Sequence, residues 1–253
     1  MFRPRLIVVL LIGPRGLVKT SQFRDHTYVG DPVNAVRVFS EFGADELMIL
    51  DINGYREART IPAGLLEDIS CQATAPLSVG GGIRTLSDIG RIVSAGAEKI
   101  ILGSHAVTNP QFVRQAAMEF GSSTISVCID AKPAPGGGYE ACTLNGSRRS
   151  GIDVVSFALM MEEMGAGELV VQSIERDGQL SGFDLDLVGQ VATSVSVPVV
   201  ALGGGRHMDD FKLAWSAGSA SAAAAGSAFV FFRKRGAVLL NYPPKMAAML
   251  NGG

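Results

Sequence analysis

Cysteine is scarce in this chain, and its pattern excludes a disulfide framework. The 253 residues contain three cysteines, Cys71, Cys128 and Cys142. Their number is odd and their spacing matches no metal-ligand motif, so we interpret them as reduced packing residues and expect no metal. Reduced thiols are typical of a reducing compartment, which predicts a cytoplasmic protein.

An excess of charge of one sign is also lacking. Lysine and arginine total 22 against 24 aspartates and glutamates, for a formal net charge of −2. This balance, with a basic cluster only at 233–235, predicts no nucleic-acid partner. The N-terminal apolar run at 6–12 is too short to span a bilayer, so we expect no membrane association. The histidines, His26, His105 and His207, are scattered, and none is assigned a catalytic role.

Short apolar or β-branched runs alternate along the chain with longer segments of helical period. This alternation predicts βαβ units and a parallel sheet. Strands are expected at 6–11, 47–52, 77–79, 99–102, 124–130, 169–173, 199–202 and 222–225. Helices are expected at 31–42, 86–95, 110–120, 154–164, 185–193 and 208–217, and a small hairpin around 136–138 in the irregular stretch 133–150. Eight such units without a Pro-, Gly- or Ser-rich linker predict one (β/α)8 TIM barrel domain over 1–253, closed by the segment 245–250.

Several motifs occur twice, roughly 120 residues apart. A Gly-Gly-Gly turn stands at 80–82 and again at 203–205, and Gly-Ser stands at 103–104 and again at 226–227. A repeat of this length is half a domain rather than a solenoid unit. We therefore predict two duplicated half-barrels, at about 1–122 and 123–253.

The repeated glycine turns follow the third, fourth, seventh and eighth expected strands. The active site of a (β/α)8 barrel lies at this face. Glycine lets backbone N–H groups approach an anion closely, so each pair of turns predicts one phosphate site. The alternative is that the glycines only make tight turns, but their recurrence favours two phosphate sites and a ligand phosphorylated at both ends.

Six motifs together resemble one known family. They are Gly30-Asp31-Pro32, Ala44-Asp45-Glu46-Leu47 with Leu50-Asp51-Ile52, Val79-Gly80-Gly81-Gly82-Ile83, Ile129-Asp130-Ala131-Lys132, Gly165-Ala166-Gly167-Glu168 and Arg176-Asp177-Gly178. From about Arg5 to Ser227, the chain is similar to the cyclase subunit of imidazole glycerol phosphate synthase. The resemblance implies a half-barrel duplication that takes ammonia from a glutaminase partner and uses it on a bisphosphorylated ribonucleotide, without a cofactor. With the glycine turns, it implies phosphate contacts from Gly81, Gly82, Gly103, Ser104, Gly178, Gly204, Gly226 and Ser227.

The resemblance also implies two catalytic carboxylates, at the ends of the first and fifth strands, that work as an acid and base pair. Asp130 matches the second position, but Leu11 stands at the first. Leucine cannot transfer a proton, and neither Asp51 nor any other neighbour is an obvious replacement. Losing one member of such a pair costs roughly 10²- to 10⁴-fold in rate, so we expect severely reduced cyclase turnover.

Charged residues at the starts of four expected strands match the family's ammonia gate. They are Arg5, Glu46, Lys99 and Glu168. Taken singly, each of them is expected to be an ordinary solvated residue at the start of a strand. As a set, they match a ring of unlike charges, which is costly to bury unless its members are mutually paired. Glu98 matches an acidic position that faces the glutaminase.

A retained gate beneath an altered reaction site predicts a subunit that still conducts ammonia but delivers it elsewhere. The segments at 10–11, 17–20, 30–37 and 239–243 resemble the branch of the family linked to surface polysaccharides, in which ammonia serves sugar amidation. A sugar amidotransferase is then a second candidate partner. The alternatives are a genuine cyclase of histidine biosynthesis, the sister isomerase, which Leu11 also disfavours, and a non-enzymatic sugar-phosphate sensor.

Overall fold

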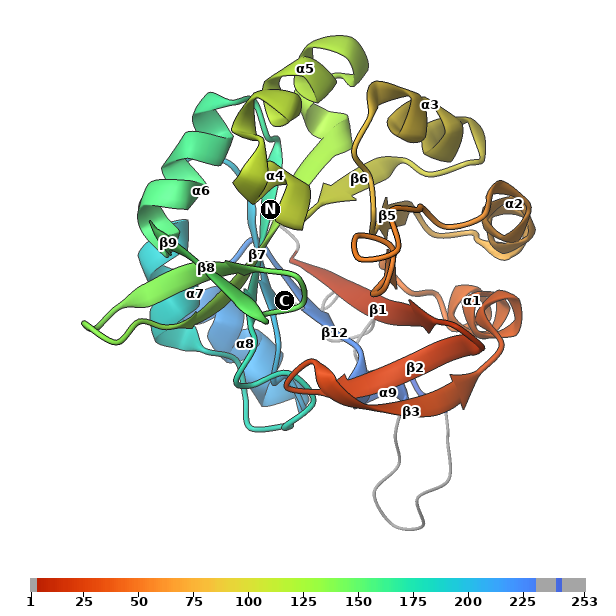
Figure 1. The fold of residues 1–253 in the computed structure, drawn as a ribbon. Coiled ribbons are helices and arrows are strands. Elements are labelled where there is room, and N and C mark those ends of the chain that lie inside the picture. The colour runs from red at the N-terminus through yellow and green to blue at the C-terminus, as the bar shows by residue number, and fades with distance from the viewer. Residues whose placement is uncertain (1–3, 231–239, 243–253) are drawn as a thin grey trace.

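Eight parallel strands close into a barrel at the centre of the computed structural model, which describes residues 4–230 and 240–242 (Figure 1). Around the barrel the order is β1 (Arg5–Gly13), β4 (Glu46–Asp51), β5 (Leu77–Gly80), β6 (Lys99–Leu102), β7 (Ile125–Pro133), β10 (Glu168–Ser173), β11 (Val199–Leu202) and β12 (Ala222–Ala225). Because β12 pairs with β1 in parallel, no strand of this set has a free edge. The predicted (β/α)8 TIM barrel is confirmed.

Helices lie between the strands and cover the outside of the barrel (Figure 1). They are α1 (Pro32–Glu41), α2 (Ala63–Gln72), α3 (Leu86–Ser94), α4 (Ser104–Thr108), α5 (Pro110–Phe120), η1 (Ser122–Thr124), α6 (Val154–Glu163), α7 (Leu185–Ala192), α8 (Met208–Ser216) and α9 (Ser227–Val230). The starts of α1 and α5 agree with the sequence: Asp31 Oδ1 accepts from Asn34 N at 2.8 Å, and both helices carry proline in their first turn. No helix within the described ranges is long and apolar enough to cross a membrane.

Two antiparallel hairpins project from the barrel at the ends of its strands. One consists of β8 (Tyr139–Thr143) and β9 (Arg148–Asp153), and it extends β7. The turn between β7 and β8, at 134–138, lies where the sequence predicts a small hairpin, whereas the pairing of β8 with β9 was not predicted. The other consists of β2 (Gly16–Ser21) and β3 (Arg24–Gly30) and continues β1. Neither this second hairpin nor helix α2 was predicted from the sequence.

Alternate residues of each barrel strand face two separate apolar clusters. On β1, Leu6 and Val8 pack outward under the helices, whereas Ile7 and Val9 point into the barrel. The interior cluster consists of Ile7, Val9, Met48, Ile101, Cys128, Val170, Val200, Leu202, Ala222 and Ala224. The barrel is thus filled by side chains between its two ends, and Leu11 and Leu50 pack against this filling. The segments 233–235 and 245–250 lie outside the described residues. The division of the chain into one domain with two half-barrels stays a prediction.

Candidate functional site

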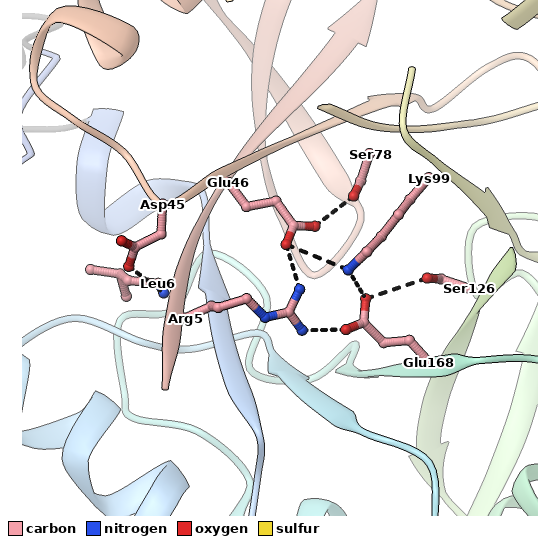
Figure 2. A network of polar contacts seen from close by, with 8 residues as sticks. All are labelled: Arg5, Leu6, Asp45, Glu46, Ser78, Lys99, Ser126 and Glu168. Carbon is pink, nitrogen blue, oxygen red and sulfur yellow. Dashed lines mark hydrogen bonds and ion pairs between the residues drawn. The ribbon is translucent and has the colours of Figure 1, made fainter. Parts of the chain in front are cut away.

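Four charged side chains meet where the barrel strands begin, which we call the floor (Figure 2). They are the predicted gate residues Arg5, Glu46, Lys99 and Glu168, the first residues of β1, β4, β6 and β10. Arg5 Nη1 lies 2.6 Å from Glu46 Oε2, and Arg5 Nη2 pairs with Glu168. Lys99 Nζ lies 3.0 Å from Glu168 Oε1 and 3.6 Å from Glu46 Oε2. Each cation therefore pairs with both carboxylates, and we call this closed arrangement the floor ring.

The carboxylates of the floor ring are buried, whereas its cations reach solvent. The side chains of Glu46 and Glu168 are 3% and 7% exposed, against 32% and 22% for the arginine and the lysine. Ser78 Oγ donates to Glu46 Oε1 at 2.5 Å, and Ser126 Oγ donates to Glu168 Oε1 at 3.3 Å. Burial lowers the pKa of Arg5, but the two carboxylates outweigh it and raise that pKa above its usual value. Buried carboxylates are costly unless they are paired and hydrogen-bonded, and the floor ring meets both needs.

Glu98, the predicted partner contact, is an exposed residue next to the floor ring. It directly precedes Lys99, and its backbone N–H donates to the carbonyl oxygen of Leu77 at 2.9 Å. Its side chain is therefore available at the outer surface of the floor. The contact with a partner stays a prediction.

A cavity of about 120 Å³ opens at the other end of the barrel, which we call the mouth. Its lining includes four of the predicted phosphate contacts, Gly81, Gly82, Gly103 and Ser104. The cavity reaches into the barrel as far as Cys128 of the interior cluster. The structure thus brings the first half's glycine turns together around one space.

A second, smaller cavity of about 40 Å³ lies beside the first. It is lined by the other four predicted phosphate contacts, Gly178, Gly204, Gly226 and Ser227. Leu11, Thr20 and Gln172 line both cavities. All eight predicted residues therefore lie at one mouth, in two groups, and their binding of phosphate stays a prediction.

Contacts within the protein explain several of these glycines without a ligand. A Cβ atom on Gly82 would lie 1.7 Å from the carbonyl oxygen of Arg59, and φ at Gly82 is +76°. At Gly178, a Cβ atom would lie 2.2 Å from the carbonyl oxygen of Thr20. Gly103 differs, because a Cβ atom there would meet nothing within 4 Å. Of these three, Gly103 alone leaves room that a ligand rather than the chain can fill.

Asp130 lies on the wall of the larger cavity, and its carboxyl is unusually basic. Burial raises its pKa to about 7, and the Asp177 carboxylate adds to the effect, while Cys128 and Lys132 oppose it. Cys128 Sγ donates to Asp130 Oδ1 at 3.7 Å, and Gln172 stands opposite Asp130 in the β7–β10 pairing. A carboxyl with this pKa can donate or accept a proton near neutral pH. The geometry fits the predicted catalytic role, which stays a prediction.

Leu11 occupies the mouth end of β1, where the resemblance implies a second carboxylate. Its side chain packs with Leu50 on the interior cluster and lines both cavities. Asp51 does not replace the missing acid. Its Oδ2 pairs with Arg59, and its Oδ1 accepts from the backbone N–H groups of Asn53 and Gly54, both at 3.0 Å. At this end of β1, the chain therefore presents the apolar side chain of Leu11 to both cavities.

Asp177 is a second carboxylate at the mouth, and it was not predicted as a site residue. It lines the smaller cavity, and its pKa is raised, chiefly by burial. The motif Arg176-Asp177-Gly178 was the available signal, but the role of Asp177 depends on the unpredicted β2–β3 hairpin. His26 and His105, which the sequence left without a role, also line the larger cavity. In the described part of the chain, no group of three His, Cys, Asp or Glu side chains is placed to hold a metal ion.

The sequence of the chain is similar to proteins of one kind. Residues 5–235 match the family model described as "Histidine biosynthesis protein". The chain is 41% identical to the putative imidazole glycerol phosphate synthase subunit hisF3 of Vibrio vulnificus, over 96% of this chain and 94% of the relative. It is 40% identical to the putative subunit hisF2 of Pseudomonas aeruginosa, over 96% and 97% of the two chains. It is 37% identical to the imidazole glycerol phosphate synthase subunit HisF of Alkaliphilus metalliredigens, over 90% and 91%.

Proposed function

Because the chain belongs to the histidine biosynthesis protein family, with relatives named as HisF subunits of imidazole glycerol phosphate synthase, we propose that it conducts ammonia through its barrel. In this proposal, a glutaminase subunit docks at the floor, and the ammonia that leaves the mouth serves sugar amidation in surface-polysaccharide biosynthesis. A sugar amidotransferase then receives the ammonia. The observation that carries the proposal is a closed floor ring beneath a mouth that has Leu11 in place of an acid.

The floor ring suits the entrance of a conduit for a small polar molecule. Its cations are linked to both carboxylates and are partly exposed, so one ion pair can open while the others hold the remaining charges. Above the floor ring, the barrel is filled with apolar side chains such as Ile7, Met48 and Val170. An apolar interior favours neutral ammonia over the ammonium ion, because a charge is costly to desolvate.

Leu11 is the residue that argues against cyclase activity. Ring closure on the bisphosphorylated ribonucleotide needs acid and base groups on both sides of the substrate, and the β1 side of the mouth offers Leu11 and Leu50. In this proposal, Asp130 contacts a different ligand at the mouth rather than the ribonucleotide. The step to sugars rests on the sequence resemblance to the polysaccharide-linked branch.

A second candidate function is the cyclase itself, and Asp177 is the observation that favours it. The Asp177 carboxylate raises the pKa of Asp130, and Gln172 lines both of the cavities that these carboxylates line. Two interacting carboxylates can divide into an acid and a base. In this reading, Asp177 takes the place left by Leu11.

The test is the origin of the transferred nitrogen. The chain, its glutaminase subunit and the sugar amidotransferase are supplied with glutamine labelled with ¹⁵N at the amide and with excess unlabelled ammonium. Conducted ammonia keeps the label in the sugar, because it does not mix with the solution. We expect a high label fraction for the parent, a large loss for Lys99→Ala, and no change for Lys212→Ala, which removes an exposed lysine of α8. A label diluted as fully as bulk ammonium in the parent would contradict conduction.

A further inference from the structure

The β2–β3 hairpin is fastened across the mouth to the loop that follows β10. Thr20 Oγ1 donates to Asp177 Oδ2 at 2.7 Å, and the backbone N–H of Phe23 donates to the same oxygen at 3.3 Å. The backbone N–H of Gln22 donates to the carbonyl oxygen of Asp177 at 2.9 Å. One residue of the β10 loop thus receives three hydrogen bonds from the hairpin.

Neighbours of Asp177 add to this fastening. Gln22 Nε2 donates to the carbonyl oxygen of Glu175 at 3.0 Å, and Gln179 Nε2 donates to Ser21 Oγ at 2.6 Å. Gly178 lets the two backbones touch, since a Cβ atom there would lie 2.2 Å from the carbonyl oxygen of Thr20. The contact therefore extends over the whole tip of the hairpin.

The base of the hairpin is held by the pairing of β2 with β1 and by buried Leu17, whereas its tip has a strained turn. Ser21 pairs with Arg24, so Gln22 and Phe23 form a two-residue turn with φ of 51° and 61°. Turns of this type favour Asn-Gly, because other side chains are strained at positive φ. Arg24–Tyr28 of β3 are exposed, and Tyr28 is 56% exposed. A strained turn with little burial persists only where outside contacts fix it.

We propose that Asp177 is a positioning residue that holds the β2–β3 hairpin in place and thereby sets the walls of both mouth cavities. Thr20 lines both cavities, Phe23 and His26 line the larger one, and Leu17 and Val18 line the smaller one. Asp177 therefore affects the shape of both cavities through the hairpin. This role does not depend on which nitrogen acceptor or phosphate compound the protein serves.

Amide hydrogen exchange of the full-length protein tests this role. In Asp177→Ala, we expect peptides covering residues 16–30 to exchange roughly tenfold faster or more, because the hairpin loses two side-chain hydrogen bonds. Peptides of β5 and β6, on the far side of the mouth, serve as internal reference and keep their parent rates. Glu175→Gln is the matched control, since it removes an exposed carboxylate two residues away and leaves the backbone acceptor.

Two further variants separate positioning from general destabilisation. Asp177→Asn keeps an oxygen that can accept from Thr20 and Phe23, so it should restore most of the lost protection. In the Asp177→Ala background, replacing Gln22-Phe23 with Asn-Gly relieves the strained turn and should also restore it. The role is wrong if Asp177→Ala leaves the hairpin within twofold of the parent rate, or if hairpin and reference peptides accelerate equally. Failure of the Asn-Gly rescue would refute the strain argument.

Discussion

Neutralising Glu168 should lower the free energy of unfolding, because Glu168 pairs with both cations of the floor ring. Removing one partner of a fully buried ion pair costs roughly 3–5 kcal/mol. Here the partners of Glu168 are the arginine and the lysine, which are 32% and 22% exposed and keep Glu46 as a second carboxylate. We therefore expect Glu168→Gln to lower the free energy of unfolding by about 2 kcal/mol, which is below that range because both cations reach solvent.

A double-mutant cycle tests whether the four charges act as one unit. Glu168→Gln leaves the floor ring with one excess positive charge, Lys99→Met leaves it with one excess negative charge, and the double variant is neutral again. We expect each single change to cost about 2 kcal/mol and the double variant to cost about the same as one of them.

The assay is urea unfolding followed by circular dichroism at 25 °C. Glu41→Gln is the control, because it breaks the exposed pair with Arg37 on α1 and should cost below about 0.5 kcal/mol. Costs of Glu168→Gln and Lys99→Met that add to within about 0.5 kcal/mol would refute the closed ring, because uncoupled sites are additive.

Two further predictions concern the mouth. Gly82→Ala should lower the free energy of unfolding by roughly 2 kcal/mol or more, because its Cβ atom would meet the carbonyl oxygen of Arg59. Gly103→Ala should leave the free energy of unfolding unchanged and weaken the binding of inorganic phosphate. Urea unfolding and phosphate titration check the two variants, and equal losses of stability would contradict this prediction. A native pKa of about 7 for Asp130 means that the folded state binds more protons than the unfolded state between about pH 4 and 7, so this carboxyl costs stability as pH rises through that window. Relative to Asp130→Asn, the parent should lose roughly 2 kcal/mol between pH 5 and pH 8, reduced from the full linkage value because the side chain borders a cavity; parallel curves for the two proteins would refute the raised pKa.

Elements with strong local signals could be predicted from the sequence. The eight barrel strands are short apolar runs, and α1 begins where Asp31 and Pro32 predict the start of a helix. Helix α2 was missed because its first residues follow Pro62, which makes no side-chain cap. The β2–β3 hairpin was missed because Gln22-Phe23 carries no turn signal and β3 is largely polar.

The floor ring and the mouth differ in how much of their chemistry the sequence could reveal. The residues of the floor ring sit at strand starts, so the barrel topology alone brings them together. The surroundings of Asp177 could not be predicted, because its main side-chain partner, Thr20, lies 157 residues away on a hairpin that was not foreseen. The steric reasons for Gly82 and Gly178 likewise depend on backbone contacts that only the folded chain shows.

Leu11→Asp, compared with the parent, shows whether position 11 removes cyclase activity from this barrel. Ammonia-dependent turnover of the bisphosphorylated ribonucleotide is measured for both purified proteins, with Leu11→Asn as an uncharged control of similar polarity. If the mouth has lost half of an acid and base pair, the parent should be slow, and Leu11→Asp should raise the rate roughly 10²-fold or more. A parent that already turns over rapidly, and that Leu11→Asp leaves unchanged or slows, would contradict an ammonia-conducting subunit and support the cyclase.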